Sequence, residues 1–137
     1  MAHEQDAAGG ALGLATTFIH LRDGGDAEPV AVTRSFWGRS AGPLYDRLVG
    51  VFDFDSSRDL HASMQEMHPE ADEVLYLVSG AIDVVVERSG AEHSLALEAG
   101  EAAIVPRGAW HRLVMRRPGR LLFINSRTGM QSRARNT

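Results

Sequence analysis

The sequence contains no cysteine and no lysine, and both absences narrow its chemistry. Without cysteine there is no disulfide, no thiol nucleophile and no thiolate ligand for a metal. All fourteen basic residues are arginine, which excludes a lysine Schiff base and pyridoxal-phosphate enzymes. Imidazole and carboxylate groups remain as the side chains able to hold a metal, and they favour a hard or borderline ion.

Long apolar runs and a positive net charge are also absent. No stretch approaches the roughly 20 apolar residues of a membrane span, and the N-terminus lacks the basic and apolar regions of a secretory signal. The net charge is −4 at pH 7, so no overall basic field attracts nucleic acid. We therefore expect a cytoplasmic protein that binds neither membranes nor nucleic acid.

Short strand-like segments, each followed by turn residues, run through most of the chain. They are rich in β-branched and aromatic residues, and glycine, proline, serine or aspartate separates them. This pattern predicts an all-β, antiparallel sandwich or barrel without a long helix. The expected strands are 16–21, 30–37, 49–55, 60–68, 74–78, 81–87, 93–97, 102–105, 110–115 and 120–125, with one helical turn as an option at 44–48.

The two ends of the chain lack this pattern. Residues 1–13 are small and polar, which predicts a flexible N-terminal arm, and residues 128–137 form a polar segment that predicts a flexible C-terminal tail. The 137 residues have the length of one domain. We therefore expect a single β-barrel domain at 14–127.

Residues 66–80 carry the first group of candidate ligands. Glu66 and His68 are two positions apart, so on a strand they point to the same face. Pro69 cannot donate to a sheet and should end that strand. Glu73 then opens a new apolar strand, which Gly80 should stop.

Residues 100–111 carry the second group. A turn at Gly100 precedes a short strand, and Pro106-Arg107-Gly108 makes another turn. His111 then opens the strand through Met115.

These stretches resemble the two motifs of the cupin superfamily. The first motif usually runs His-x-His, three or four residues, Glu, six residues, Gly. Here His68, Glu73 and Gly80 have that spacing, and Glu66 stands where the family has its first histidine. The second motif usually runs Gly, five residues, Pro-x-Gly, two residues, His, three residues, Asn. Here the spacing holds from Gly100 through His111, and Met115 replaces the asparagine.

The resemblance implies a double-stranded β-helix, or jelly-roll barrel, with a metal bound inside. The implied ligands are His68, Glu73 and His111, with Glu66 as a fourth. Two imidazoles and a carboxylate with open positions suit Fe(II). A second carboxylate makes the site richer in oxygen, which favours Fe or Mn and leaves Zn and Ni open.

Two alternatives remain open for these side chains. Glu66 could be a catalytic general base beside the metal rather than a ligand. The interior could also hold no metal, with the histidines and carboxylates bonded to one another. In that case the two carboxylates repel, and one of them needs a raised pKa.

The neighbours of the ligands predict a pocket for a small-molecule ligand. Alternation along the strands gives the side chains that should share the ligands' face: Met64, Leu75, Leu113 and Met115. Arg107, in the turn before His111, could bind a substrate carboxylate or phosphate, or lie in solvent. His61 has the opposite parity from Glu66, so it should face away from the site.

Three functions fit this reading. The first is a metal-dependent oxygenase acting on a small organic acid, and the second is a non-catalytic small-molecule binding or sensing protein. The third, a sugar isomerase or epimerase, ranks lower because no histidine–tyrosine pair has a matching spacing and Tyr76 should point away from Glu73. The apolar residues expected on the outer face, including Val74 and Val78, predict a homodimer.

Overall fold

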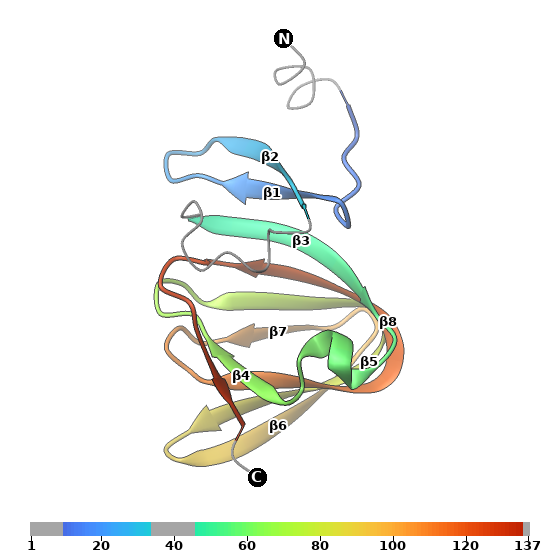
Figure 1. Ribbon diagram of the computed structural model, residues 1–137, viewed down its shortest axis with the longest axis vertical. Coiled ribbons are helices and arrows are strands. Elements are labelled where there is room, and N and C mark those ends of the chain that lie inside the picture. Colours follow the sequence, from blue (N-terminus) through green and yellow to red (C-terminus); the bar gives the residue numbers. More distant parts are fainter. Residues whose placement is uncertain (1–9, 34–45, 136–137) are drawn as a thin grey trace.

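The computed structural model describes residues 10–33 and 46–135, which form a nine-stranded antiparallel fold (Figure 1). Within these two ranges no helix is long or apolar enough to span a bilayer. The elements are β1 (Thr17–Leu21), β2 (Ala27–Ala31), β3 (Arg47–Phe54), the 3-10 helix η1 (Ser57–Leu60), β4 (Met64–Met67), β5 (Glu73–Arg88), β6 (Ala91–Glu98), β7 (Ala102–Val105), β8 (His111–Asn125) and β9 (Gln131–Ala134).

The two long strands β5 and β8 are the centre of the fold. They pair from Val74 opposite Ile124 to Val86 opposite His111. The half containing the start of β5 and the end of β8 is extended by β3, β1 and β2 on one side and by β7 on the other. The second half carries β6 beside β5, β4 beside β8, and β9 beside β4. Side chains from both halves meet in one hydrophobic core.

Two glycines allow β5 and β8 to bend together between the halves, as Figure 1 shows. Gly80 has a φ of +87°, and a Cβ there would lie 2.5 Å from the carbonyl oxygen of Pro118. A Cβ on Gly119 would overlap the carbonyl of Ser79. The sequence predicted turns at 79–80 and 116–119 that would end the strands there. That prediction was wrong, because bulges let β5 and β8 continue through the bend from one half of the sheet to the other.

The segment before the first candidate ligands also differs from its prediction. A strand was expected over 60–68, but Leu60 ends η1, and β4 begins only at Met64 and ends at Met67. His61, which follows η1, has a left-handed conformation with φ 53°. The alternation rule for strands therefore does not apply to His61.

The N-terminal strands are shifted relative to the sequence prediction. β2 is Ala27–Ala31 rather than 30–37, and residues 34–45 lie outside the described part of the chain. Arg47 and Leu48, expected in an optional helical turn, begin β3 instead. Gly50 in β3 leaves room for the edge-to-face contact of Phe18 and Phe123, whose ring centres are 5.2 Å apart.

Strand β9 lies in the segment for which a flexible tail was expected. It pairs with β4, from Met64 opposite Ala134 to Met67 opposite Gln131. Arg133 in β9 donates to Gln65 Oε1 at 2.7 Å and to Glu87 Oε2 at 2.8 Å, and it stacks 4.0 Å above the ring centre of Trp110. These contacts fasten the C-terminal strand beside the candidate ligands in β4.

The close approach of β5 and β8 at the bend leads to a prediction about protein stability. Gly80→Ala should lower the free energy of unfolding by about 1–3 kcal/mol more than Gly90→Ala, because a Cβ at position 80 meets the backbone of β8. Gly90 is the matched control, since its φ is +79° and a Cβ there meets no atom within 4 Å. Urea unfolding of both variants measures the difference. Equal losses would show that the positive φ, not the close approach of β5 and β8, fixes the glycine.

Candidate metal centre

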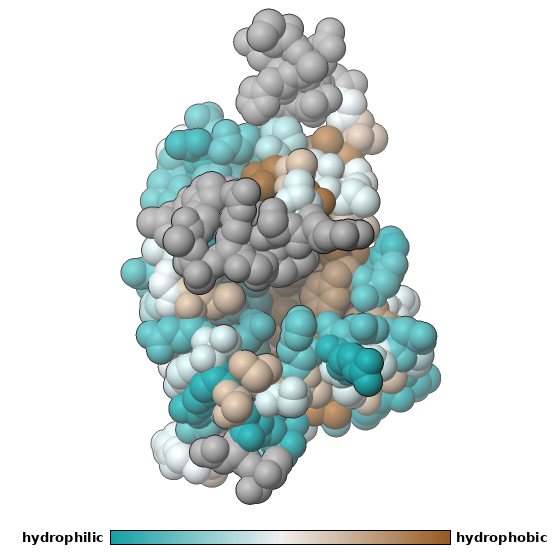
Figure 2. Space-filling model, viewed as in Figure 1, coloured by the Kyte–Doolittle hydropathy of each residue, from teal (hydrophilic) through white to brown (hydrophobic). Residues whose placement is uncertain are grey.

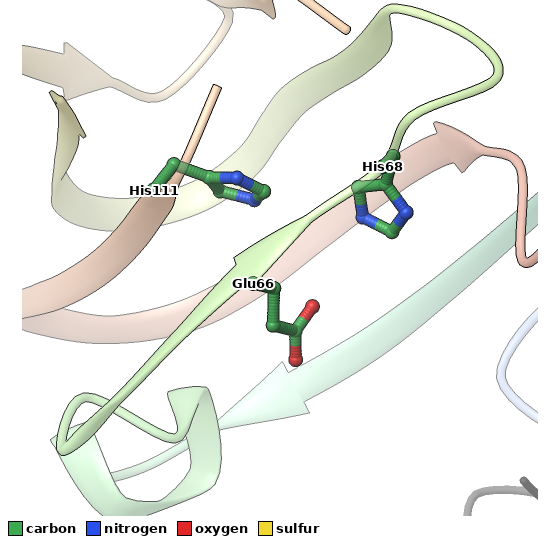
Figure 3. Close-up of side chains that lie close together, drawn as sticks. All are labelled: Glu66, His68 and His111. Atoms are coloured by element: carbon green, nitrogen blue, oxygen red, sulfur yellow. The ribbon is translucent and has the colours of Figure 1, made fainter. Parts of the chain in front are cut away.

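Three ligand-type side chains from β4, the turn after it and β8 converge in the interior. Glu66 lies in β4, His68 follows that strand, and His111 begins β8 (Figure 3). One ligand atom from each lies within 4.8 Å of the others. Glu66 and His111 are direct partners across β4 and β8, so the strand pairing itself sets their separation. This arrangement could hold a metal ion.

His68 presents an unsatisfied nitrogen to this space. Its side chain is buried, and its Nδ1–H donates to the carbonyl oxygen of Ser126 at 2.9 Å. Since a carbonyl can only accept, the neutral form of this imidazole carries its lone pair on Nε2. This buried Nε2 has no hydrogen-bond partner, and Glu73 Oε2 lies 3.5 Å away. A ring nitrogen fixed in this way is the usual arrangement of a metal-ligating histidine.

Glu73, at the start of β5, lies between the two imidazoles. Its Oε1 is 2.9 Å from His111 Nε2, and its Oε2 accepts from Asn125 Nδ2 at 2.7 Å. Burial alone would raise the pKa of Glu73, but the bond to His111, the charges of both histidines and the Asn125 amide together lower it. Glu73, also a predicted ligand, therefore lies beside both histidines but is not one of the three side chains whose ligand atoms converge.

The same contact changes the titration of His111. Burial alone would lower the pKa of His111, but the hydrogen bond to Glu73, and the charges of Glu73 and Glu66, raise it. Glu73 and His111 thus form a buried ion pair when no metal is bound. A metal at His111 Nε2 would have to displace the proton that this pair shares.

A cavity of about 730 Å³ adjoins the candidate ligands. Glu66, Glu73 and His111 line it together with apolar side chains from both halves of the fold, among them Phe52, Leu60, Met64, Leu75, Leu113 and Phe123. Figure 2 shows brown, apolar atoms recessed near the middle of this face, next to hydrophilic ones. Glu66, Glu73 and His111 are therefore accessible from a largely apolar recess, whereas His68 is buried beside them and does not line it.

The structure places the predicted pocket residues in different environments. Met64, Leu75 and Leu113 line the cavity. Met115 packs against the hydrophobic core instead. Arg107 has a side chain that is 64% exposed; its guanidinium lies 3.5 Å from Asp72, and its backbone N–H donates to the same carboxylate at 2.9 Å. Neither Met115 nor Arg107 is part of the cavity wall.

Sequence reasoning missed several residues of the site. Asn125 and Ser126 hold Glu73 and His68 from the end of β8, at positions that belong to neither motif. His61 was expected to face away, but it lines the cavity because it follows a 3-10 helix rather than lying in a strand. The one available signal was the short Asp–Ser-rich segment before His61, which is typical of a turn.

Comparison with known proteins agrees with this fold. Residues 61–125 match the family model described as a cupin domain. No curated protein matches the sequence. With its motifs, its bent antiparallel sheet and this match over residues 61–125, the cupin resemblance and fold that the sequence predicted are confirmed.

Similar solved structures share low sequence identity with the chain. A cupin-2 domain containing protein from Shewanella frigidimarina is 17% identical, with 64% of this chain and 78% of that chain covered and a TM-score of 0.47. Oxalate oxidase in complex with the substrate analogue glycolate is 22% identical, with 63% and 45% covered and a TM-score of 0.50. Fe(II) HppE in complex with substrate is 18% identical, with 58% and 42% covered and a TM-score of 0.48. The chain thus spans less than half of the last two, and the likeness concerns the fold alone.

The buried ion pair gives a pH prediction for protein kept metal-free with a chelator. The lowered pKa of Glu73 contributes stability above the ordinary value of 4.5, and this contribution is lost as pH falls through the lowered pKa. The raised pKa of His111 contributes below the ordinary value of 6.5, and this is lost as pH rises through the raised pKa. The difference in unfolding free energy between wild type and Glu73→Gln should therefore be largest between about pH 4.5 and about pH 6.5. A difference that does not vary with pH would contradict the ion pair.

Proposed function

We propose that the chain binds a divalent metal ion through His68, His111, Glu66 and Glu73 and acts as a metal-dependent oxygenase on a small organic acid. The observation that carries the metal proposal is the buried Nε2 of His68, which lacks a hydrogen-bond partner where the ligand atoms of Glu66 and His111 converge. A buried acceptor without a partner is costly, and a bound cation would remove that cost.

The donor set narrows the identity of the ion. Two imidazoles with one or two carboxylates favour Fe or Mn, and Zn or Ni also accept these donors. When bound, such an ion supplies Lewis-acid or redox chemistry at coordination positions that the protein leaves open. The apolar walls of the cavity would limit the access of water to that position.

The protein's own residues have separate parts in this proposal. Ser126 fixes the tautomer of His68, and Asn125 orients Glu73. Glu66 is half-buried and lines the cavity, so it serves either as the fourth ligand or as the general base that takes a proton from the organic acid. His111 releases a proton when it becomes a ligand, so metal affinity should rise with pH.

A non-catalytic binding or sensing protein is the second candidate. It is favoured by the 2.9 Å contact between Glu73 and His111, since this ion pair satisfies both groups without a metal. The isomerase or epimerase alternative has less support. Tyr76, the tyrosine nearest in sequence to Glu73, is 39% exposed and does not line the cavity.

We also propose that the chain forms a homodimer through the outer face of the larger half-sheet. Consecutive strand pairings align one apolar row across six strands, which consists of Pro29, Ile19, Val49, Ile124, Val74 and Ile104. Ile104 is 67% exposed, and Val78 beside this row is 44% exposed. A second copy would cover this surface and remove it from water.

The metal proposal is tested by elemental analysis of untagged protein purified without chelator. Wild type should contain close to one Fe or Mn per chain, and His68→Ala should lose most of it. Removing a residue that only supports a ligand weakens metal binding by about 10- to 100-fold, and removing a ligand itself should weaken it at least as much. His93→Ala is the control, since His93 is exposed on β6. Stoichiometric metal in His68→Ala would contradict the assigned ligands, and metal-free wild type that divalent ions do not stabilise would favour the binding-protein alternative.

The dimer proposal is tested by sedimentation. Wild type should sediment as a dimer, and Ile104→Asp should sediment with the 14.9 kDa mass of one chain, because a charge buried in the interface is costly. Leu95→Asp serves as the control, since Leu95 is 52% exposed on β6, outside the apolar row. A monomeric wild type at micromolar concentration would refute the homodimer.

A further inference from the structure

The charged side chains around the cavity are mostly occupied by partners within the protein. Asp53 receives two hydrogen bonds from Arg120, at 2.6 and 3.1 Å. Arg112 donates two hydrogen bonds to Glu92, both at 3.1 Å. A ligand that entered the cavity would not find these charges available.

Arg58 and His61 differ from this pattern. Both line the cavity, and within the described part of the chain neither side chain has a hydrogen bond or ion pair. The nearby carboxylate of Asp59 is already engaged, since its Oδ2 accepts the backbone N–H of Asp55 at 2.8 Å. The guanidinium of Arg58 and the imidazole of His61 are therefore free to bind a ligand.

The end of η1 brings these two side chains to the same cavity. His61 directly follows the helix, and its backbone N–H donates to the Arg58 carbonyl at 3.0 Å. Arg58 and His61 both line the cavity, so both offer donors to a ligand inside it.

The backbone of His61 supports a role for its side chain. Its φ of 53° and ψ of 45° lie in the left-handed region, which glycine occupies without steric cost and which is the usual place for glycine after a helix. A histidine at this position lowers stability relative to glycine. Backbone strain of this kind is commonly found at functional sites.

We propose that Arg58 and His61 together bind the carboxylate of an organic acid whose apolar body fills the cavity toward the metal ligands. Arg58 matches a carboxylate with two parallel hydrogen bonds, and an imidazole N–H can add a third. The size and lining of the cavity define the rest of the ligand. A space of about 730 Å³ walled by Phe52, Met64 and Leu113 is much larger than a two-carbon acid needs, and it fits an aromatic or branched aliphatic monocarboxylate.

This inference deepens the proposed function and rests on it, so the experiment separates the two. The probes are 2-naphthoate and 2-naphthamide, which share an aromatic body and differ in charge. Their dissociation constants are measured by fluorescence with wild type, Arg58→Gln, His61→Gly and the control Arg88→Gln. Arg88 is exposed at the end of β5 and does not line the cavity. Metal content and thermal unfolding are recorded for each protein.

Wild type should bind 2-naphthoate more tightly than 2-naphthamide. Arg58→Gln should weaken naphthoate binding about tenfold and leave naphthamide binding and metal content unchanged, since it removes one charge-assisted pair. His61→Gly should also weaken naphthoate binding, yet unfold at the same or a higher temperature because it relieves the left-handed strain.

Three results would overturn the inference: no binding of naphthoate, equal weakening of both probes by Arg58→Gln, or the same effect from Arg88→Gln. In each case wild type that retains metal leaves the proposed metal function intact. If wild type contains no metal but still binds naphthoate more tightly than naphthamide through Arg58, the acid-binding site is supported and the proposed oxygenase function is not.

Discussion

The antiparallel pairing of β5 with β8 along nearly their whole length is the constraint on which the rest of the structure depends. It places Glu73, at the start of β5, beside Asn125, at the end of β8. The bend at Gly80 and Gly119 then folds the paired strands over, so that His111, at the start of β8, contacts the same Glu73. One folded ribbon thus assembles both halves of the core and most of the site.

This geometry brings several buried ionisable side chains together, and most of them form ion pairs or hydrogen bonds with one another. Glu73 is stabilised as a carboxylate by two imidazoles and an amide, which outweigh the effect of its burial on its pKa. The exception is Nε2 of His68, which its bond to Ser126 leaves as a buried lone pair. Protons and a metal cation are therefore alternative partners for the same cluster, and each would stabilise a different protonation state of His111.

Part of the cavity wall does not belong to the paired strands β5 and β8. It is formed by residues of η1 and of the segment after β8, which are both short. Strand β9 is fastened beside β4 by Arg133 through Gln65, Glu87 and Trp110. Three candidate metal ligands thus lie on strands and His68 directly follows one, whereas residues that would select a ligand, such as Arg58, lie on connecting segments, where changes of sequence alter the fold least.

The sequence by itself determined the all-β class and the cupin resemblance, and it named the candidate ligands that the structure brings together, because strand alternation and motif spacing are local properties. The strand end at Pro69 and the spacing from His68 to Glu73 can be recognised from neighbouring residues alone. Only the tertiary structure decided that Gly80 and Gly119 bend strands rather than end them, that Asn125 supports Glu73, and that His61 faces the cavity while Arg107 does not. Each of these depends on contacts between segments far apart in the chain, and local periodicity carries no information about such contacts.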